Sequence, residues 1–267
     1  MANRKTIIVT ITIFIFTILT SCNNTEAEEP KVNYSLDTAV YEWVDFKSND
    51  SLNLIVDLEY HIPKFKYPKK ISNDINGVLF YGKDTTVSDF DVEAYKRNTL
   101  IYYYESALED NYISGKTNSQ YIIKTKTQVY LNNPNIVSIR KETYRYTGGA
   151  HGNIDIENLN YNLRENHLIT INDIFNKKNK KNVKNIILQK IKSKYNIPKN
   201  SDISEFNFFV SDSSLYVSSN LLLTDSNIVF TYNTYEISPF DIGVINIKIP
   251  YTEIQNNIKA NNQFIVK

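Results

Sequence analysis

The chain has 267 residues, and its 30 basic and 29 acidic side chains give a formal net charge of +1. This balanced charge lacks the basic footprint of a nucleic-acid-binding protein, so we expect no nucleic-acid partner. The single cysteine excludes an internal disulfide, and the length suffices for one large domain or two small ones. The 20 tyrosines are typical of β-rich structure, with a tyrosine-rich binding face as the alternative.

The first residues predict export and a lipid anchor. Arg4 and Lys5 precede a short apolar run that ends in Leu19-Thr20-Ser21-Cys22. A basic start, an apolar stretch and small residues are typical of a secretory signal, which we place at residues 1–21. The Leu-x-small-Cys ending resembles the lipobox of bacterial lipoproteins, so Cys22 is the expected lipidation site, carrying acyl chains such as palmitate. An ordinary cleaved signal or an uncleaved helical anchor is the alternative.

A polar, acidic segment follows the cysteine and is interpreted as a tether at residues 22–35. Through its anchor the chain is expected to have the membrane as one partner and the cell envelope as its location. Because Asn23 stands where an aspartate would signal retention at the inner membrane, we expect the outer membrane in a two-membrane bacterium.

Alternation of apolar and polar residues predicts a strand within residues 52–60, with Tyr41-Glu42-Trp43 as part of its partner. Two helices are expected next, near residues 71–81 and 89–110, the second with Ser88 as its N-cap. The apolar residues of the second helix are spaced by threes and fours and predict its buried stripe: Phe90, Ala94, Ile101, Tyr104 and Leu108.

The character changes to strands beyond residue 120. The chain predicts strands at 121–131, 136–146 and 154–163, a helix at 179–195, and further strands at 206–210, 215–217, 228–232 and 244–249. This order predicts an α+β fold in which antiparallel sheets pack against helices in two subdomains. We place the subdomains at residues 36–115 and 116–260.

The densest motif is Tyr146-Thr147-Gly148-Gly149-Ala150-His151-Gly152-Asn153, which holds three of the chain's seven glycines between two predicted strands. Crowded glycines turn a tight corner or admit the close approach of a ligand or another backbone. The corner is favoured, because neither a phosphate-binding lysine nor a helix start follows.

This octapeptide resembles the "Y-x-G-G-A-H-x-N" signature of the extracellular domain shared by the anti-sigma factor RsiV and the peptidoglycan deacetylase PdaC. Residues 160–175 are similar to a second conserved stretch of that family, and residues 235–251 to a third, beginning Tyr235-Glu236-Ile237-Ser238-Pro239-Phe240. Residues 163–167 lack the family's Thr-Gly turn, and Phe240 replaces a tyrosine. The first subdomain, residues 36–115, would then correspond to the companion domain that precedes the RsiV/PdaC-like domain in this family.

The resemblance implies a binding module of the cell envelope. In PdaC the deacetylase chemistry belongs to a separate metal-dependent domain, which we do not expect after residue 254. The leading hypothesis is therefore a non-enzymatic lipoprotein that binds peptidoglycan or, as in RsiV, a lysozyme-like protein. The residues expected to bind lie on and beside the glycine motif: Tyr144, Tyr146, Thr147, Gly148, Gly149, His151 and Asn153.

Catalytic, metal and cofactor sites are not predicted. His61, His151 and His167 lie in different expected elements and lack the spacing of zinc ligands. One alternative is a cell-wall polymer hydrolase in which His151 pairs with Asp155 or Glu157 as acid and base. Another is a structural envelope lipoprotein with no soluble ligand.

Overall fold

The computed structural model describes residues 34–45, 53–65, 68–82, 89–114 and 118–266. The predicted signal, Cys22 and most of the expected tether lie outside this part of the chain. Within it, no helix is both long and apolar enough to cross a membrane.

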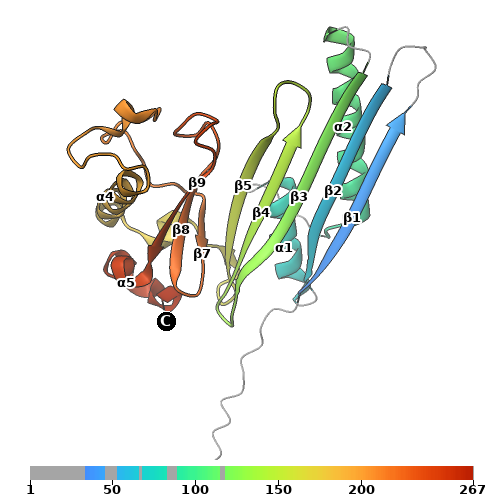
Figure 1. Ribbon diagram of the computed structural model, residues 1–267. Helices are drawn as coiled ribbons and strands as arrows, with labels where there is room; N and C mark the ends of the chain where they lie inside the picture. The colour runs from blue at the N-terminus through green and yellow to red at the C-terminus, as the bar shows by residue number, and fades with distance from the viewer. Residues whose placement is uncertain (1–33, 46–52, 66–67, 83–88, 115–117, 267) are drawn as a thin grey trace, which may run out of the picture.

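A six-stranded sheet forms the first unit, which we define as residues 34–168 (Figure 1). Its strands lie side by side in chain order: β1 Tyr34–Asp45, β2 Asn53–Phe65, β3 Asn118–Asn132, β4 Ile136–Tyr146, β5 Asn153–Asn162 and β6 His167–Leu168. The alternating segment at 52–60 lies in β2, and the strands predicted at 121–131, 136–146 and 154–163 correspond to β3, β4 and β5.

One strand pair departs from the expected antiparallel arrangement. β2 and β3 run parallel, with Tyr60 opposite Thr125, whereas every other neighbouring pair in the sheet is antiparallel. Parallel neighbours need a crossover connection, which the two helices between these strands supply. The α+β class is confirmed, and the first sheet is mixed. Because β2 and β3 lie on either side of residue 115, the sheet is continuous across the subdomain boundary placed there.

Helices α1 (Lys69–Tyr81) and α2 (Val92–Ser114) cover the same face of this sheet (Figure 1). They bury two neighbouring apolar clusters against it. The cluster of α1 comprises Ile71, Ile75, Leu79, Val137, Ile139, Leu159 and Tyr161, and that of α2 comprises Leu58, Tyr60, Ala107, Tyr121 and Ile123. Apolar burial on one sheet face therefore holds both helices in place.

The start of α2 differs from the prediction. The helix begins at Val92, and the carboxylate of Asp91 accepts the backbone N–H groups of Glu93 and Ala94 at 2.9 and 3.1 Å. Asp91 therefore caps the helix, while Ser88 lies outside the described residues. Ile101 is 40 % exposed although it was expected on the buried stripe, because the helix turns Ala107 and its neighbours toward the sheet instead.

The second unit, residues 169–266, packs a three-stranded antiparallel sheet against helix α4 (Lys177–Lys194). Its strands are β7 Leu221–Leu223, β8 Asn227–Tyr232 and β9 Ile245–Pro250. The short helices are α3 Ile171–Ile174, α5 Tyr251–Ile254 and the 3-10 turns η1 Ile203–Phe206, η2 Gln255–Asn257 and η3 Ala260–Val266. Val183, Ile187 and Ile191 of α4 are fully buried in its core.

Two predicted strands of this unit are absent. Residues 207–217 form irregular chain and turns after η1. Phe208 and Leu215 are buried there, 5 % and 2 % exposed, as separate anchors in the core. The side chain of Lys192 pins this segment to α4 by bonding the carbonyl of Lys199 and the carboxylate of Asp212. Burial rather than strand pairing thus explains the apolar residues.

Two asparagine side chains close the edge of β5 that β4 leaves free. The amide of Asn233 accepts the N–H of Ile156 at 2.8 Å and donates to its carbonyl at 3.1 Å. The amide of Asn220 accepts the N–H of Asn158 at 2.8 Å and donates to the Ile156 carbonyl at 2.6 Å. Each amide reproduces the donor and acceptor of a neighbouring peptide. We call Asn220 and Asn233 the asparagine clamp.

A polar cluster joins the two units behind this edge. Asn158 of β5 donates to the hydroxyl of Thr231 on β8 at 2.9 Å, and the Thr231 hydroxyl donates to Asn246 on β9 at 2.8 Å. The guanidinium of Arg140 bonds Asn158 at 2.9 Å from the neighbouring strand β4. The second unit therefore sits on the sheet face opposite α1, held by hydrogen bonds that link strands of both sheets.

Candidate functional site

The glycine motif forms the loop of the β4–β5 hairpin. Gly148 and Gly149 have φ angles of +92° and +97°, so the loop needs glycine there for its backbone conformation. Gly152 serves a different purpose, because a β-carbon at its position would lie 2.4 Å from the ring of Tyr144. The hydroxyl of Tyr146 donates to the Gly149 carbonyl at 3.3 Å and ties the loop to the end of β4. The predicted corner therefore exists.

His151 stacks on a residue of the other resembling segment. Its ring lies 3.7 Å from that of Phe240, centroid to centroid, with 19° between the planes. Tyr235 lies 6.0 Å from Phe240 and has a φ of +66°, a left-handed conformation that is uncommon for a tyrosine. Two motifs far apart in the sequence thus meet at one exposed spot. We call His151, Tyr235 and Phe240 the signature surface.

The acid–base pair of the hydrolase alternative is not assembled. The carboxylate of Asp155 forms an ion pair with Arg145 and accepts from the side chain of Asn153. Glu157 lies 2.8 Å from the ammonium of Lys141. His151 instead has its Nδ1 3.2 Å from the carbonyl of Gly152 and its ring on Phe240. Both carboxylates are paired with cations of β4.

The remaining predicted binding residues divide between the loop and its two strands. Thr147 is exposed at the loop, while Tyr144 and Tyr146 lie on the β4 face that points away from α1 and α2. Thr143 and Arg145 alternate with them and therefore point toward the helices. That helix-side face holds a site that no sequence motif predicted.

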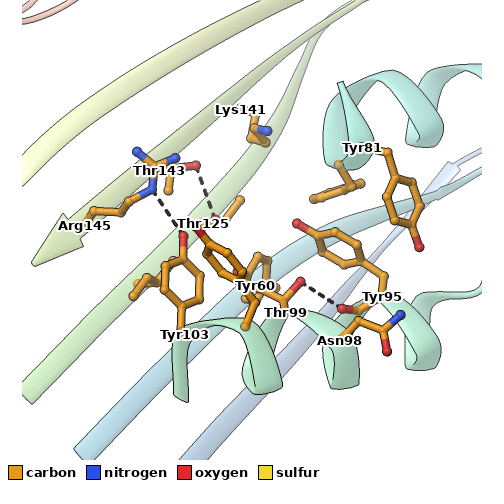
Figure 2. A pocket seen from close by; sticks show the side chains of 13 residues that line it. Tyr60, Tyr81, Tyr95, Asn98, Thr99, Tyr103, Thr125, Lys141, Thr143 and Arg145 are labelled. Atoms are coloured by element: carbon orange, nitrogen blue, oxygen red, sulfur yellow. Dashed lines mark hydrogen bonds between the residues drawn. The ribbon is translucent and has the colours of Figure 1, made fainter. Parts of the chain in front are cut away.

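A pocket of about 330 Å³ opens between this sheet face and the two helices (Figure 2). Six of its thirteen lining residues are aromatic, and the others are mainly hydroxyl, amide and cationic side chains. We call it the tyrosine pocket; it is lined by Tyr60, Phe80, Tyr81, Tyr95, Asn98, Thr99, Tyr102, Tyr103, Ile123, Thr125, Lys141, Thr143 and Arg145.

The rings of the pocket pack mainly edge to face. Tyr95 lies 5.8 Å from Tyr60 and 5.3 Å from Tyr81, with interplanar angles of 89° and 86°. This is the arrangement that aromatic quadrupoles favour, and it holds the ring faces in fixed directions. At the outer side, Tyr102 is 64 % exposed and Tyr81 41 % exposed. The pocket therefore combines a rigid floor with two accessible tyrosines.

Burial keeps the inner tyrosines neutral. It raises the pKa of Tyr95 to about 12, and it raises the pKa of Tyr60 further above the ordinary value. A neutral phenol can both donate and accept a hydrogen bond. Both phenols are therefore neutral through the physiological pH range, and their hydroxyls interact with each other at the floor of the pocket.

The polar groups of the pocket are partly engaged with one another. The hydroxyls of Thr125 and Thr143 lie 3.3 Å apart, and Nε of Arg145 donates to the Tyr103 hydroxyl at 3.3 Å (Figure 2). Burial lowers the pKa of Arg145, but the bond to Tyr103 and the charge of Asp155 outweigh it and raise the pKa overall. The arrangement suits a neutral ligand rich in hydroxyl groups rather than a bare anion.

One sequence signal pointed to this pocket. Tyr95, Asn98, Thr99, Tyr102 and Tyr103 recur at spacings of three and four, which places them on one face of α2. The other lining residues come from β2, α1, β3 and β4, and only the fold brings them together. Within the described residues, histidine, cysteine and carboxylate side chains form no group of three or more able to hold a metal ion.

The chain matches two family models in succession. The model described as deacetylase PdaC matches residues 49–154, and the model of a protein of unknown function, DUF3298, matches residues 172–252. The octapeptide therefore lies at the end of the first match. No curated protein matched the chain.

Two solved structures share the fold. A DUF3298 family member from Bacteroides fragilis is 19 % identical with a TM-score of 0.65, covering 88 % of this chain and 98 % of its own. A DUF3298 family protein from Pseudomonas aeruginosa is 17 % identical with a TM-score of 0.58, covering 87 % and 97 %. At these identities the likeness establishes the fold alone. The two model matches show that the chain carries a PdaC-type domain followed by a DUF3298 domain.

Proposed function

We propose that the chain is a non-enzymatic lipoprotein of the cell envelope, anchored through Cys22, and that its tyrosine pocket binds a saccharide of peptidoglycan. The lipobox-like sequence supports the anchor. Asn23, in place of an aspartate that would signal inner-membrane retention, supports the outer membrane as the address in a two-membrane bacterium. The observation that carries the binding proposal is the pocket itself, with aromatic walls and neutral hydroxyl groups in one concavity.

Saccharides suit this lining for a chemical reason. A pyranose ring presents C–H groups on its faces and hydroxyl groups around its rim, so it can pack on an aromatic ring while its rim forms hydrogen bonds. Tyrosine supplies both kinds of contact and loses little conformational freedom. The volume of about 330 Å³ is near the lower end of the usual range for ligand sites, roughly 300–1,000 Å³. The pocket therefore suits one sugar unit rather than a long stretch of polymer.

Sedimentation with insoluble peptidoglycan tests this function. The full-length protein, purified in a detergent without a sugar head group, is expected to pellet with the polymer. Tyr102→Ala removes an exposed aromatic wall and is expected to weaken retention about threefold to tenfold. Tyr235→Ala is the matched control, because Tyr235 is a similarly exposed tyrosine outside the pocket. Wild-type protein that stays in the supernatant, or equal effects of the two variants, would count against the proposal.

A lysozyme-like protein is the second candidate ligand, and the signature surface favours it. Tyr235 and Phe240 are 53 % and 37 % exposed, and the exposed carboxylates of Glu236 and Asp241 flank them. Exposed aromatic residues beside acidic groups suit the surface of a basic protein. In a lysozyme pull-down the same two variants should reverse their roles, so that Tyr235→Ala weakens binding and Tyr102→Ala does not.

A further inference from the structure

A second cavity lies beside the tyrosine pocket at the C-terminal end of α1. It measures about 260 Å³, and its wall is mainly aliphatic, made by Val78, Leu79, Leu159, Leu168, Ile171 and Leu221. We call it the aliphatic cavity. Six of its lining residues, Asn160 and residues 168–172, belong to the stretch at 160–175 that resembles the family, and the others come from α1, β5 and the chain at β7.

Lys141 separates the two cavities. Its side chain lines the tyrosine pocket, while its ammonium lies 2.8 Å from the carboxylate of Glu157 and donates to the carbonyl of Leu79. Glu157 and Leu79 both line the aliphatic cavity. Successive residues of α1 are divided in the same way, since Val78 and Leu79 line one cavity and Phe80 and Tyr81 the other. The two cavities therefore share a single wall with a cation in it.

The rim of the aliphatic cavity is polar. Exposed Glu157, Thr170, Asn172 and Ser219 surround its apolar wall. Glu157 pairs with Lys141, the Thr170 hydroxyl bonds Asp173, and Asn172 accepts from Lys180. A short peptide offers amide groups to the remaining valences of this rim and an aliphatic side chain to the wall. The ammonium at the junction in turn suits a carbonyl oxygen placed between the two parts of a ligand.

We propose that the two cavities form one bipartite site for a sugar that carries a short peptide arm. The sugar occupies the tyrosine pocket, the carbonyl that links the arm faces Lys141, and the aliphatic side chain of the first amino acid enters the aliphatic cavity. This inference rests on the proposed saccharide site and names its ligand class as a muramyl peptide, the repeating chemistry of peptidoglycan. Separately each cavity is small, and together they approach the size of an ordinary ligand site.

Calorimetric titration of the full-length protein with three probes tests the inference. The probes are the neutral sugar N-acetylglucosamine, muramyl dipeptide, and an alkyl glucoside below its micellar concentration. Muramyl dipeptide is expected to bind at least about tenfold more tightly than the sugar alone. An alkyl glucoside that gains as much from its tail would overturn the assignment of a peptide arm. The detergent again carries no sugar head group.

Two variants separate this inference from the proposed function. Val78→Asn places an amide in the aliphatic cavity and should remove the tenfold advantage of the dipeptide while leaving binding of the sugar unchanged. Leu168→Ser repeats the test from the opposite wall if Val78→Asn lowers the melting temperature. Tyr102→Ala should weaken both ligands alike. A sugar that binds while its arm adds nothing contradicts the bipartite site only, whereas a sugar that does not bind contradicts the saccharide pocket itself.

Discussion

In the glycine motif, the sequence predicted the turn of the backbone but not the side chains that the motif contacts. The crowded glycines predicted a tight turn, and the positive φ angles of Gly148 and Gly149 explain why glycine stands at these two positions. The stacking of His151 on Phe240 was beyond sequence reasoning, because Phe240 belongs to a loop of the second unit and nothing in its local pattern indicates its neighbour. The pocket was missed for the same reason, since the spacing along α2 indicates only one of its walls and the others come from β2, α1, β3 and β4.

Gly152 offers a test of close packing at this scale. Gly152→Ala places a β-carbon against the ring of Tyr144 and should lower the free energy of unfolding by about 1–3 kcal/mol, the usual effect of overpacking. Denaturant unfolding measures it. In a Tyr144→Ala background the same change should cost much less, because the ring that it meets is gone. Equal losses in both backgrounds would show that the contact does not explain the glycine.

At the scale of elements, periodicity predicted strands and helices well where one face is buried. The hairpin of β4 and β5, helix α1 and helix α4 all lie within a few residues of their expected bounds. The pattern failed at residues 206–217, where Phe208 and Leu215 are buried without strand pairing. It also could not reveal that β2 and β3 run parallel, since a strand's apolar pattern is independent of its neighbour's direction.

The asparagine clamp leads to a prediction about the edge of β5. Asn220→Asp replaces the amide donor to the Ile156 carbonyl by a carboxylate oxygen, so it should destabilise the fold by about 1–3 kcal/mol. Because the carboxylate is repelled by that carbonyl, hydrogen exchange should be faster at the amide of Asn158, which Asn220 accepts, while the amide of Ile156 keeps its acceptor Asn233. Asn256→Asp, at an exposed position, is the matched control and should change stability by less than about 0.5 kcal/mol. Unchanged exchange in Asn220→Asp would argue against the clamp.

For the whole molecule, the two units behave as one structure because hydrogen bonds and burial join them. The polar cluster of Asn158, Thr231 and Asn246 crosses from the first sheet to the second. Its members are ordinary polar residues of strands, and no spacing rule identifies them beforehand. The α+β class was predictable from the order of elements, whereas the hydrogen bonds between the two sheets are apparent only in the folded structure.

Buried tyrosines in both units predict alkaline unfolding. Burial raises the pKa of Tyr60 and Tyr95 in the first unit and of Tyr232 and Tyr251 in the second. Below pH 10 the folded and unfolded chains both keep these protons, so stability does not change. Above pH 10 the unfolded chain loses protons that the folded chain retains, and each tyrosine lowers the free energy of unfolding by up to about 1.4 kcal/mol per pH unit.

For Tyr95 this loss should extend to about pH 12, the pKa of the folded state. Urea unfolding at intervals from pH 8 to pH 12 measures the slope. Tyr95→Phe should make the slope shallower by one tyrosine's share, because phenylalanine has no proton to lose. A free energy of unfolding that stays constant to pH 12 would contradict the expected behaviour of these buried phenols.

The parallel pairing of β2 with β3 has a consequence for how the protein emerges during synthesis. The β1–β2 hairpin is synthesised early. The strand that pairs with the free edge of β2 is β3, which is synthesised only after helices α1 and α2. Until then one border of β2 offers unpaired peptide groups to any extended chain nearby, a recognised route to aggregation. A holding chaperone that keeps the nascent polypeptide extended until residue 132 has emerged would protect the protein during this interval.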